Sequence, residues 1–363
     1  MHQAIHPKLT AIIALLVASN TSFGAFTINL NFGSGISSGS GAESGFIAAA
    51  TYWESQLADN VTINLDVDFT TLGAGTLGQA SSESSVVSIT AYVTALAADS
   101  TSRLDTTAIA GLPTLTASSN FGGLDQISFL TQTDTESNSS TVALDNDDSG
   151  NNVFLDINTA NQKALGLFTG VPTDSDASIT FNDAFTWDFD SSDGVDPGHQ
   201  DFVGVAIHEI GHALGFTSGV DIVDFVIGNS RSADLDGFAI YSGLDLFRYS
   251  APNDLDLSAG TATYLSLDNG NTAYVGDTNP ANFSTGAFTG DGRQASHWKD
   301  NQGLGIFDPT ARPAGQVNVV TQLDLDALDI IGWDLASSSI PEPSTLIFSF
   351  IGLSAFALRR KRS

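Results

Sequence analysis

The feature that most constrains the fold is an apolar stretch, residues 202–216, which contains the sequence HEIGHALG. Most of its other positions are Val, Ile, Ala or Phe, so a helix formed here is too apolar to lie on a surface. Gln200 or Asp201 is a candidate N-cap, and Gly215 stands where a left-handed residue would end the helix. The sequence therefore predicts a buried helix that brings two histidines and a glutamate into the interior.

The two histidines of this stretch are spaced to bind one metal ion. Residues four apart share one face of a helix, so both imidazoles of His208 and His212 can reach the same ion. Glu209 can reach a water molecule on that ion without binding the ion itself. A metal ion lowers the pKa of such a water, and a carboxylate can then take its proton. The pattern is typical of zinc sites that hydrolyse peptide bonds. The alternative is a pair of core histidines, which would need polar partners.

A catalytic zinc ion usually has three protein ligands, so a third is required. In one large family it lies three residues after the helix glycine, where this chain has Ser218. Another class uses a downstream glutamate, but no glutamate occurs between Glu209 and Glu342, and Glu342 lies in the C-terminal tail. Asp221 and Asp224 stay open as ligands, although they lie off the expected spacing.

The histidines leave one well-placed candidate. His2 and His6 lie in a predicted export signal, and His199 lies nine residues before His208 in a predicted loop. His297 remains, in the phrase SHWKDNQGLGIFDP. If it is the third ligand, residues 219–296 form a loop-rich insertion that carries it back to the helix.

The phrases HEIGHALGF and SHW, followed by DP, resemble the leishmanolysin branch of the metzincin metalloproteases. In that branch an insertion separates the helix glycine from a histidine in a Ser-His-Trp phrase, and a tight turn that contains methionine follows. The resemblance implies that His208, His212 and His297 bind one catalytic Zn²⁺ and that Glu209 is the general base.

The resemblance also implies that Trp298 and the turn at residues 305–309 form the floor and wall of the site. The chain departs from the family at this turn, because Phe307 stands where methionine is expected and the chain has no methionine besides Met1. A phenylalanine can still supply an apolar platform.

The predicted fold class is α+β. Periodicity predicts strands and helices in both halves. The strands are expected at residues 25–32, 61–69, 179–189 and 264–267, and the helices at residues 46–57, 84–98 and 321–331. The resemblance implies a zincin-like catalytic domain over residues 25–338. Its upper subdomain, about residues 25–215, would hold a twisted mixed sheet and the active-site helix. Its lower subdomain, about residues 216–338, would be loop-rich with a C-terminal helix.

Both ends of the chain read as targeting segments. Residues 1–24 have a basic start, a short apolar run and small residues, which predict a secretory signal peptide. Residues 339–363 combine Pro-Glu-Pro, a short apolar stretch and a basic end, and they resemble the PEP-CTERM sorting signal of Gram-negative bacteria. That resemblance implies export, a transient inner-membrane tether, cleavage by an exosortase-type enzyme and release outside the cell. A generic transmembrane anchor is the alternative.

Charge and cysteine content exclude some classes. The chain has 41 Asp and Glu against 12 Lys and Arg, a net charge of −29, so it repels nucleic acid and anionic lipid. It has no cysteine, so disulfides cannot stabilise it.

A weaker pattern suggests a second cation. In the segment DNDDSGNNVFLD, Asp145, Asp147, Ser149 and Asp156 lie near the spacing of a calcium loop. An acidic surface loop is the alternative. A second acidic loop contains Asp188, Asp190, Asp193 and Asp196.

These patterns together predict a secreted zinc-dependent endopeptidase that acts on protein or peptide substrates. The alternative is a non-catalytic extracellular matrix or surface protein with a structural or silent zinc site.

Overall fold

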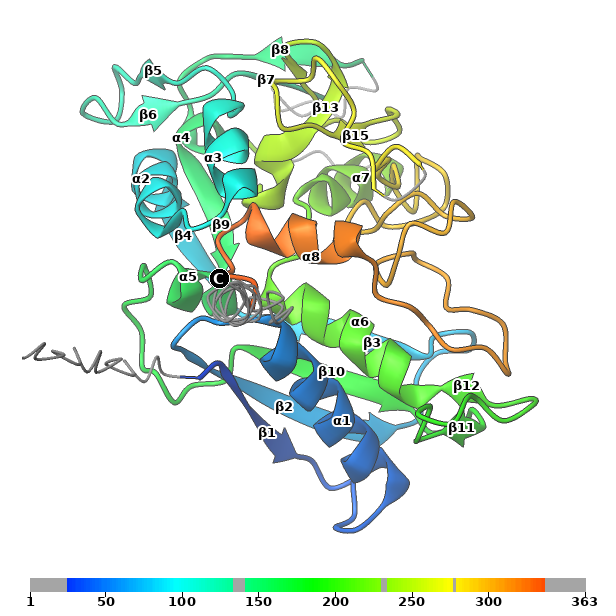
Figure 1. Cartoon of the computed structure of the whole chain (residues 1–363). Helices are drawn as coiled ribbons and strands as arrows, with labels where there is room; N and C mark the ends of the chain where they lie inside the picture. The colour runs from blue at the N-terminus through cyan, green and yellow to red at the C-terminus, as the bar shows by residue number, and fades with distance from the viewer. Residues whose placement is uncertain (1–24, 133–140, 230–233, 277–278, 337–363) are drawn as a thin grey trace, which may run out of the picture.

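Two parts of the protein pack on either side of helix α6 (Phe202–Leu214), as Figure 1 shows. A computed structural model describes residues 25–132, 141–229, 234–276 and 279–336. A sheet with one long helix lies on one side of α6, and further helices, short strands and loops lie on the other. The fold is α+β with a mixed sheet, as the sequence predicts.

The main sheet has four strands. In spatial order they are β1 (Thr27–Phe32), β2 (Thr62–Thr70), β10 (Ala177–Asn182) and β3 (Gly78–Ser82). The first three run parallel, whereas β3 lies at one edge and runs antiparallel to β10. Helix α1 (Gly41–Gln56) connects β1 to β2, and α1 and α6 lie side by side against the sheet (Figure 1).

Local sequence explains these elements. In β2, three buried apolar side chains alternate with polar ones: Ile63, Leu65 and Val67. Helix α1 begins after Ser40, whose hydroxyl accepts a hydrogen bond from the Glu43 backbone at 3.2 Å. The same helix buries Phe46 and Trp53, and the Trp53 indole donates to the Ile207 carbonyl of α6 at 3.0 Å. The strands predicted at residues 25–32 and 61–69 and the helix predicted at 46–57 are thus confirmed.

The helix predicted over residues 84–98 is wrong in its first part. Residues Ser84–Ser88 form strand β4, which pairs antiparallel with β9 (Phe154–Asn158), and only Ile89–Asp99 forms helix α2. The Ser88 hydroxyl caps this helix by accepting from the Ala91 backbone at 3.2 Å. The partner strand lies far along the chain, so the apolar spacing of residues 84–98 could not indicate the pairing.

The segment between β3 and β10 packs against the C-terminal part of the chain. The Leu257 backbone donates to the Leu130 carbonyl at 2.8 Å, and the Tyr92 hydroxyl donates to the Ile331 carbonyl at 3.2 Å. Figure 1 shows the same arrangement, with α3 (Arg103–Ala110) near α8 (Gln322–Asp329). The remaining elements of this segment are α3 (Arg103–Ala110), β5 (Thr116–Ala117), β6 (Asp125–Gln126), β7 (Phe129–Thr131), β8 (Ala143–Asp145), α4 (Gly150–Val153) and α5 (Thr159–Ala164).

Loops dominate the chain after α6. Its elements are α7 (Val220–Gly228), the short 3-10 helix η1 (Leu244–Phe247), β13 (Arg248–Ala251), β14 (Asp254–Leu255), β15 (Tyr264–Leu265) and α8 (Gln322–Asp329). Strand β15 and helix α8 lie within the strand and helix predicted at residues 264–267 and 321–331. Before α6, the predicted strand region 179–189 contains most of β10, which begins at Ala177, and all of β11 (Trp187–Asp188). Strand β11 pairs with β12 (Gln200–Asp201).

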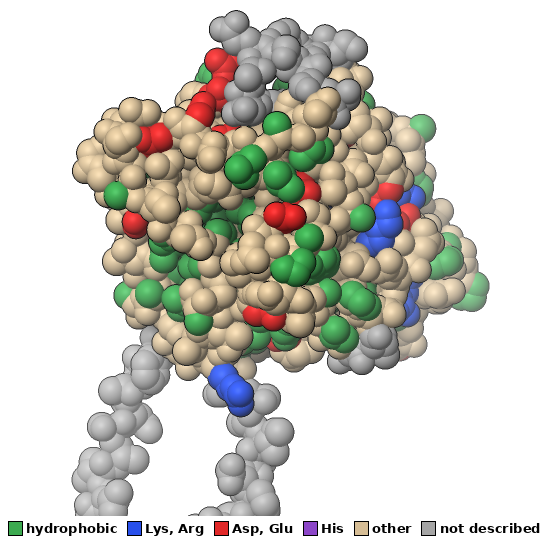
Figure 2. Space-filling model, turned by 90° about the horizontal axis from the view of Figure 1, so that it is seen from above, with side chains coloured by type: hydrophobic (Ala, Val, Ile, Leu, Met, Phe, Trp, Pro, Cys, Tyr) green, Lys and Arg blue, Asp and Glu red, His purple; other side chains and the backbone are tan. Residues whose placement is uncertain are grey.

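The face seen in Figure 2 carries few basic side chains, in agreement with the low Lys and Arg content of the chain. On the face seen in Figure 2, neutral side chains and backbone cover most of the area, with hydrophobic side chains in small scattered groups and few Lys or Arg. The predicted signal peptide, residues 1–24, lies outside the described residues, as does all of the sorting tail, residues 339–363. Within the described residues, no helix combines the length and hydropathy that crossing a bilayer requires.

Candidate metal centre

Helix α6 forms for the reasons that the sequence indicates. The Asp201 carboxylate caps it by accepting from the Gly204 backbone at 3.0 Å, and Gly215 ends it with φ +122°. Most of its side chains are buried. The indole of Trp333 donates to the Leu214 carbonyl at 2.8 Å and so pairs a carbonyl at the C-terminal end of the helix. The helix therefore presents its polar residues to a site inside the protein.

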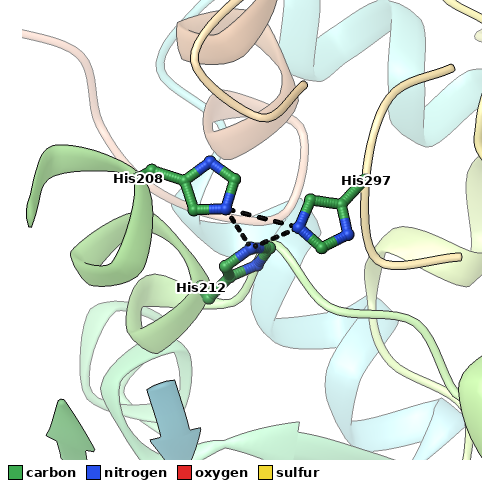
Figure 3. Close-up of side chains that lie close together, drawn as sticks. All are labelled: His208, His212 and His297. Carbon is green, nitrogen blue, oxygen red and sulfur yellow. Dashed lines mark hydrogen bonds between the residues drawn. The ribbon is translucent and has the colours of Figure 1, made fainter. Parts of the chain in front are cut away.

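The structure brings together all three histidines that the sequence predicts as ligands. His208 and His212 point from α6 toward His297, which comes from the loop on the other side (Figure 3). The Nε2 atoms of His208 and His212 are 3.0 Å apart, and they lie 3.3 and 3.2 Å, respectively, from Nε2 of His297. Among the described residues, this is the only group of three or more His, Cys, Asp or Glu side chains that could hold a metal ion.

Backbone carbonyls next to the Nδ1 atoms fix the tautomers of the three histidine rings. Nδ1 of His208 lies 2.6 Å from the Ile306 carbonyl, and Nδ1 of His212 lies 2.6 Å from the Phe216 carbonyl. Nδ1 of His297 lies 3.3 Å from the carbonyl of Gln294, three residues earlier. A carbonyl oxygen only accepts hydrogen bonds, so each Nδ1 carries the proton in the neutral ring. The three Nε2 atoms therefore face one another as lone pairs without a hydrogen between them.

Burial keeps these rings neutral. It lowers the pKa of all three histidines, and the neighbouring imidazoles also lower the pKa values of His212 and His297. Together these effects lower the pKa of His212 to about 3. Three converging lone pairs repel one another, and a cation between them turns that repulsion into attraction. Zinc–nitrogen distances of about 2.0–2.1 Å in a tetrahedral site would hold the nitrogens about 3.3 Å apart, which fits the observed spacing. The histidine cluster can thus hold a metal ion.

Glu209 lies beside the cluster on the same helix. It is buried, and burial raises the pKa of its carboxyl to about 8. A Cβ atom added at Gly78 would come within 3.2 Å of its Oε1, so the carboxyl lies next to the edge strand β3. A cation bound by the histidines would favour the ionised carboxylate.

An open cleft of about 1490 Å³ contains the cluster and Glu209. Edge strand β3 forms part of one wall, through Gly78, Gln79, Ala80 and Ser82. Residues of the loops around Ser218 and His297 form other parts of its lining. A polymeric substrate could therefore reach the three histidines from solvent.

Aromatic rings lie beneath the histidines, where the resemblance places the floor. The Phe307 ring is 5.8 Å from the ring of His212 and stacks on Phe216, with centroids 3.8 Å apart and planes 8° apart. Trp298 is fully buried, meets Phe216 edge-on at 4.9 Å and donates its backbone N–H to the Phe307 carbonyl at 2.9 Å. Phenylalanine thus occupies the apolar position under this site.

A buried carboxylate that was not predicted from the sequence supports this floor. Asp324 accepts from the Trp298 indole at 2.9 Å and from the Ile306 backbone at 2.8 Å. Ile306 provides the carbonyl that orients His208. The spacing of Thr321 and Asp324 is that of a capping box, which was the only sequence signal for this carboxylate.

The other candidate ligands lie elsewhere. His199 is in a loop before α6, with its Nδ1 3.4 Å from the Pro197 carbonyl. Asp221 accepts hydrogen bonds from the backbone of residues 295–296, and Asp224 accepts them from the backbone of residues 288–289. Ser218 donates its hydroxyl to the Asp245 carboxylate. None of these side chains belongs to the metal-holding group.

The structure does not gather the predicted calcium loop into a cation site. Asp145 is buried, and its carboxylate accepts from the amides of Asn151 at 3.0 Å and Asn152 at 2.9 Å. Asp156 lies on β9 and accepts from the Ser84 hydroxyl at 2.9 Å, whereas Asp147 is exposed. Hydrogen bonds within the protein thus account for the first and last acidic residues of the pattern.

Comparison of the chain with protein-family models, curated proteins and solved structures found no match.

Proposed function

We propose that the protein is a secreted zinc-dependent endopeptidase. The observation that carries this proposal is the convergence of three histidine Nε2 atoms beside a buried glutamate in an open cleft. Imidazole is a favoured ligand of zinc, and three protein ligands with an open position are the usual catalytic arrangement. The resemblance of the sequence to the leishmanolysin branch of the metzincins agrees with this chemistry.

Glu209 is the general base in this proposal. A zinc ion held by the three histidines would polarise the substrate carbonyl and lower the pKa of the attacking water. Glu209 follows His208 on α6 and lines the same cleft as the three histidines, which supports this role. One carboxylate oxygen takes the proton of the attacking water, and the protonated carboxyl then gives it to the leaving nitrogen.

The cleft favours an extended polypeptide as substrate. Strand β3 lies at the edge of the main sheet and lines the cleft beside Glu209. An edge strand offers unpaired N–H and C=O groups, to which an extended peptide can add as a further strand. Such pairing would hold the substrate backbone across the histidines with little dependence on its side chains.

The two ends of the sequence indicate where the proposed enzyme would act. The signal at residues 1–24 and the sorting tail at residues 339–363 imply export, a transient membrane tether and release by an exosortase-type enzyme. The acidic composition argues against nucleic acid as a partner.

The main alternative is a matrix or surface protein with a structural or silent zinc site. A structural zinc ion is usually closed by four protein ligands. The group in the described residues has three members and lies in an open cleft, which favours the enzyme.

Replacement of the general base tests the proposal. Glu209→Gln should retain one equivalent of zinc but lower the digestion rate of casein by about 10²–10⁴-fold, since only the proton transfer is removed. Glu54→Gln is the matched control, because Glu54 lies on α1 and accepts from the Ile28 backbone at 2.8 Å. A Glu209→Gln variant with full activity contradicts the mechanism. A wild-type protein that binds zinc and digests nothing favours the alternative.

A further inference from the structure

The third ligand comes from a segment without regular structure, so other groups must fix its position. His297 lies in a loop, and its Nδ1 contact with the Gln294 carbonyl is 3.3 Å long. The corresponding contacts of His208 and His212 are both 2.6 Å, and both residues are also held by α6. The Ser284 N–H donates to the His297 carbonyl at 2.9 Å, and the backbone before His297 supplies the other contacts that set its position.

One carboxylate holds that backbone from the first turn of α7. Asp221 accepts from the Ala295 N–H at 2.6 Å and from the Ser296 N–H at 3.2 Å. It also accepts from the Ser296 hydroxyl. Two consecutive peptide groups and a side chain, all within two residues of His297, thus depend on a single acidic group.

The other side of the same peptide is held by a buried cation. The Arg248 guanidinium donates to the Ala295 carbonyl at 3.2 Å and to the Ser284 carbonyl at 2.6 Å. It also lies over the Phe283 ring at 4.8 Å. Arg248 is fully buried, so its contacts are shielded from water. Ala295 is therefore fixed through both its N–H and its C=O.

Ser218 joins this network at the position where the short-spaced ligand of other zinc sites would lie. Its backbone N–H donates to the Ser296 hydroxyl at 2.8 Å, and its own hydroxyl donates to the buried Asp245 at 2.5 Å. Ser218 therefore contacts Ser296, the residue directly before His297.

We propose that Asp221 is a positioning residue for the third metal ligand. Its carboxylate holds residues 295–296 so that Nε2 of His297 meets the Nε2 atoms of the two helix histidines. Groups outside the ligand shell commonly set metal affinity in this way, by holding a ligand in its bound orientation. The inference rests on the metal site of the proposed function and not on proteolysis.

The same helix supplies a matched control. Asp224 lies one turn further along α7, and its carboxylate accepts from the Phe288 and Thr289 N–H groups at 2.8 Å and from the Thr289 hydroxyl at 2.6 Å. It therefore makes the same three kinds of contact as Asp221, but to a segment that holds no ligand. The two carboxylates separate ligand positioning from general support of a loop.

The test compares zinc affinity in Asp221→Asn and Asp224→Asn, measured by competition with a chromophoric chelator. Asn keeps the shape of Asp but replaces one acceptor oxygen with an NH₂ group. That NH₂ group would face an N–H or O–H donor of residues 295–296, so at least one hydrogen bond would be lost. Asp221→Asn should weaken zinc binding by about 10–100-fold, whereas Asp224→Asn should leave it unchanged. Cobalt(II) should show weaker d–d absorption in Asp221→Asn than in the wild type, as expected when the tetrahedral site is lost.

Equal zinc affinity in Asp221→Asn and the wild type overturns the proposal, as does equal weakening by both asparagine variants. If Asp221→Asn does not fold, Ser296→Ala removes one donor to Asp221, and Thr289→Ala removes its counterpart at Asp224. Only Ser296→Ala should then weaken zinc binding, by several-fold, and unchanged binding overturns the proposal. If the wild type binds zinc but does not cleave casein, the proposed protease function is contradicted and the proposed role of Asp221 is not.

Discussion

The two halves of the histidine cluster are built differently. His208 and His212 share one buried helix, and each ring is oriented by a backbone carbonyl 2.6 Å away. His297 arrives on a loop, 85 residues after His212, with a looser contact of its own and a set of buried polar groups behind it. The helix half needs only local spacing, whereas the loop half depends on side chains from distant parts of the chain. Local sequence patterns therefore predict the helix half of such a metal site more directly than the loop half.

The largest expected effect comes from removing a ligand in either half. His208→Ala and His297→Ala should each abolish casein digestion and weaken zinc binding by more than the 10–100-fold expected of a positioning residue. The halves should differ in metal-free stability. His208→Ala leaves the buried Ile306 carbonyl without its imidazole donor, which costs about 1–3 kcal/mol, whereas His297→Ala loses only a 3.3 Å contact. Urea unfolding of the metal-free variants measures this, and equal losses would contradict the comparison.

The next effect concerns the buried acid of the helix half. The pKa of Glu209 rises from 4.5 to about 8 on folding, so its contribution to stability is complete below pH 4.5 and is lost as the pH rises through about 8. Metal-free Glu209→Gln should therefore exceed the wild type in stability by roughly 3 kcal/mol at pH 7 and match it near pH 4. Urea unfolding at the two pH values measures the difference. A pH-independent difference would show that the carboxyl is solvated.

A smaller effect is expected where the two halves touch. A Cβ atom at Gly211 would lie 2.2 Å from Cε1 of Phe307, so Gly211→Ala forces the ring under the cluster to move. We expect a loss of about 1–3 kcal/mol, despite the better helix propensity of alanine, and weaker zinc binding. Thermal unfolding and chelator competition measure the two effects. Adding Phe307→Leu should recover part of the stability, and no recovery would place the strain elsewhere.

The smallest effect is expected for Phe307→Met, which restores the residue of the resembling family. The swap nearly conserves volume but removes the stacking on Phe216, so it should cost less than about 1.5 kcal/mol. Zinc affinity should not change, because Phe307 supplies an apolar surface and no ligand atom. Thermal unfolding and zinc competition test both expectations. A large change in zinc affinity would mean that the loop half is less tolerant than its packing indicates.

The sequence predicted those parts of the fold that have a local cause. The alternation in β2 and the apolar, capped stretch of α6 follow from neighbours within a few residues, so their predicted positions agree with the structure. Elimination among the histidines, together with the resemblance, indicated His297, which the structure brings to the cluster.

The remaining features depend on partners that no local pattern contains. Strand β4 was predicted as helix because only its pairing with β9 makes it a strand. Asp221 and Arg248 act on residues 74 and 47 positions away, and nothing in the sequence pairs them with those residues. Asp145 matched a calcium pattern, but its oxygens accept from two asparagine amides that the spacing alone could not assign to it.

The distance along the chain between His212 and His297 has a mechanical consequence. An ion bound to both would cross-link the protein and close a loop of 85 residues, as a disulfide does in many exported proteins. The chain has no cysteine to provide such a link. At a free zinc concentration 100 times the dissociation constant, binding would add about 2.7 kcal/mol to the free energy of unfolding. Removing the ion would then loosen the connection between α6 and the loop that carries His297, and it would also remove the proposed activity.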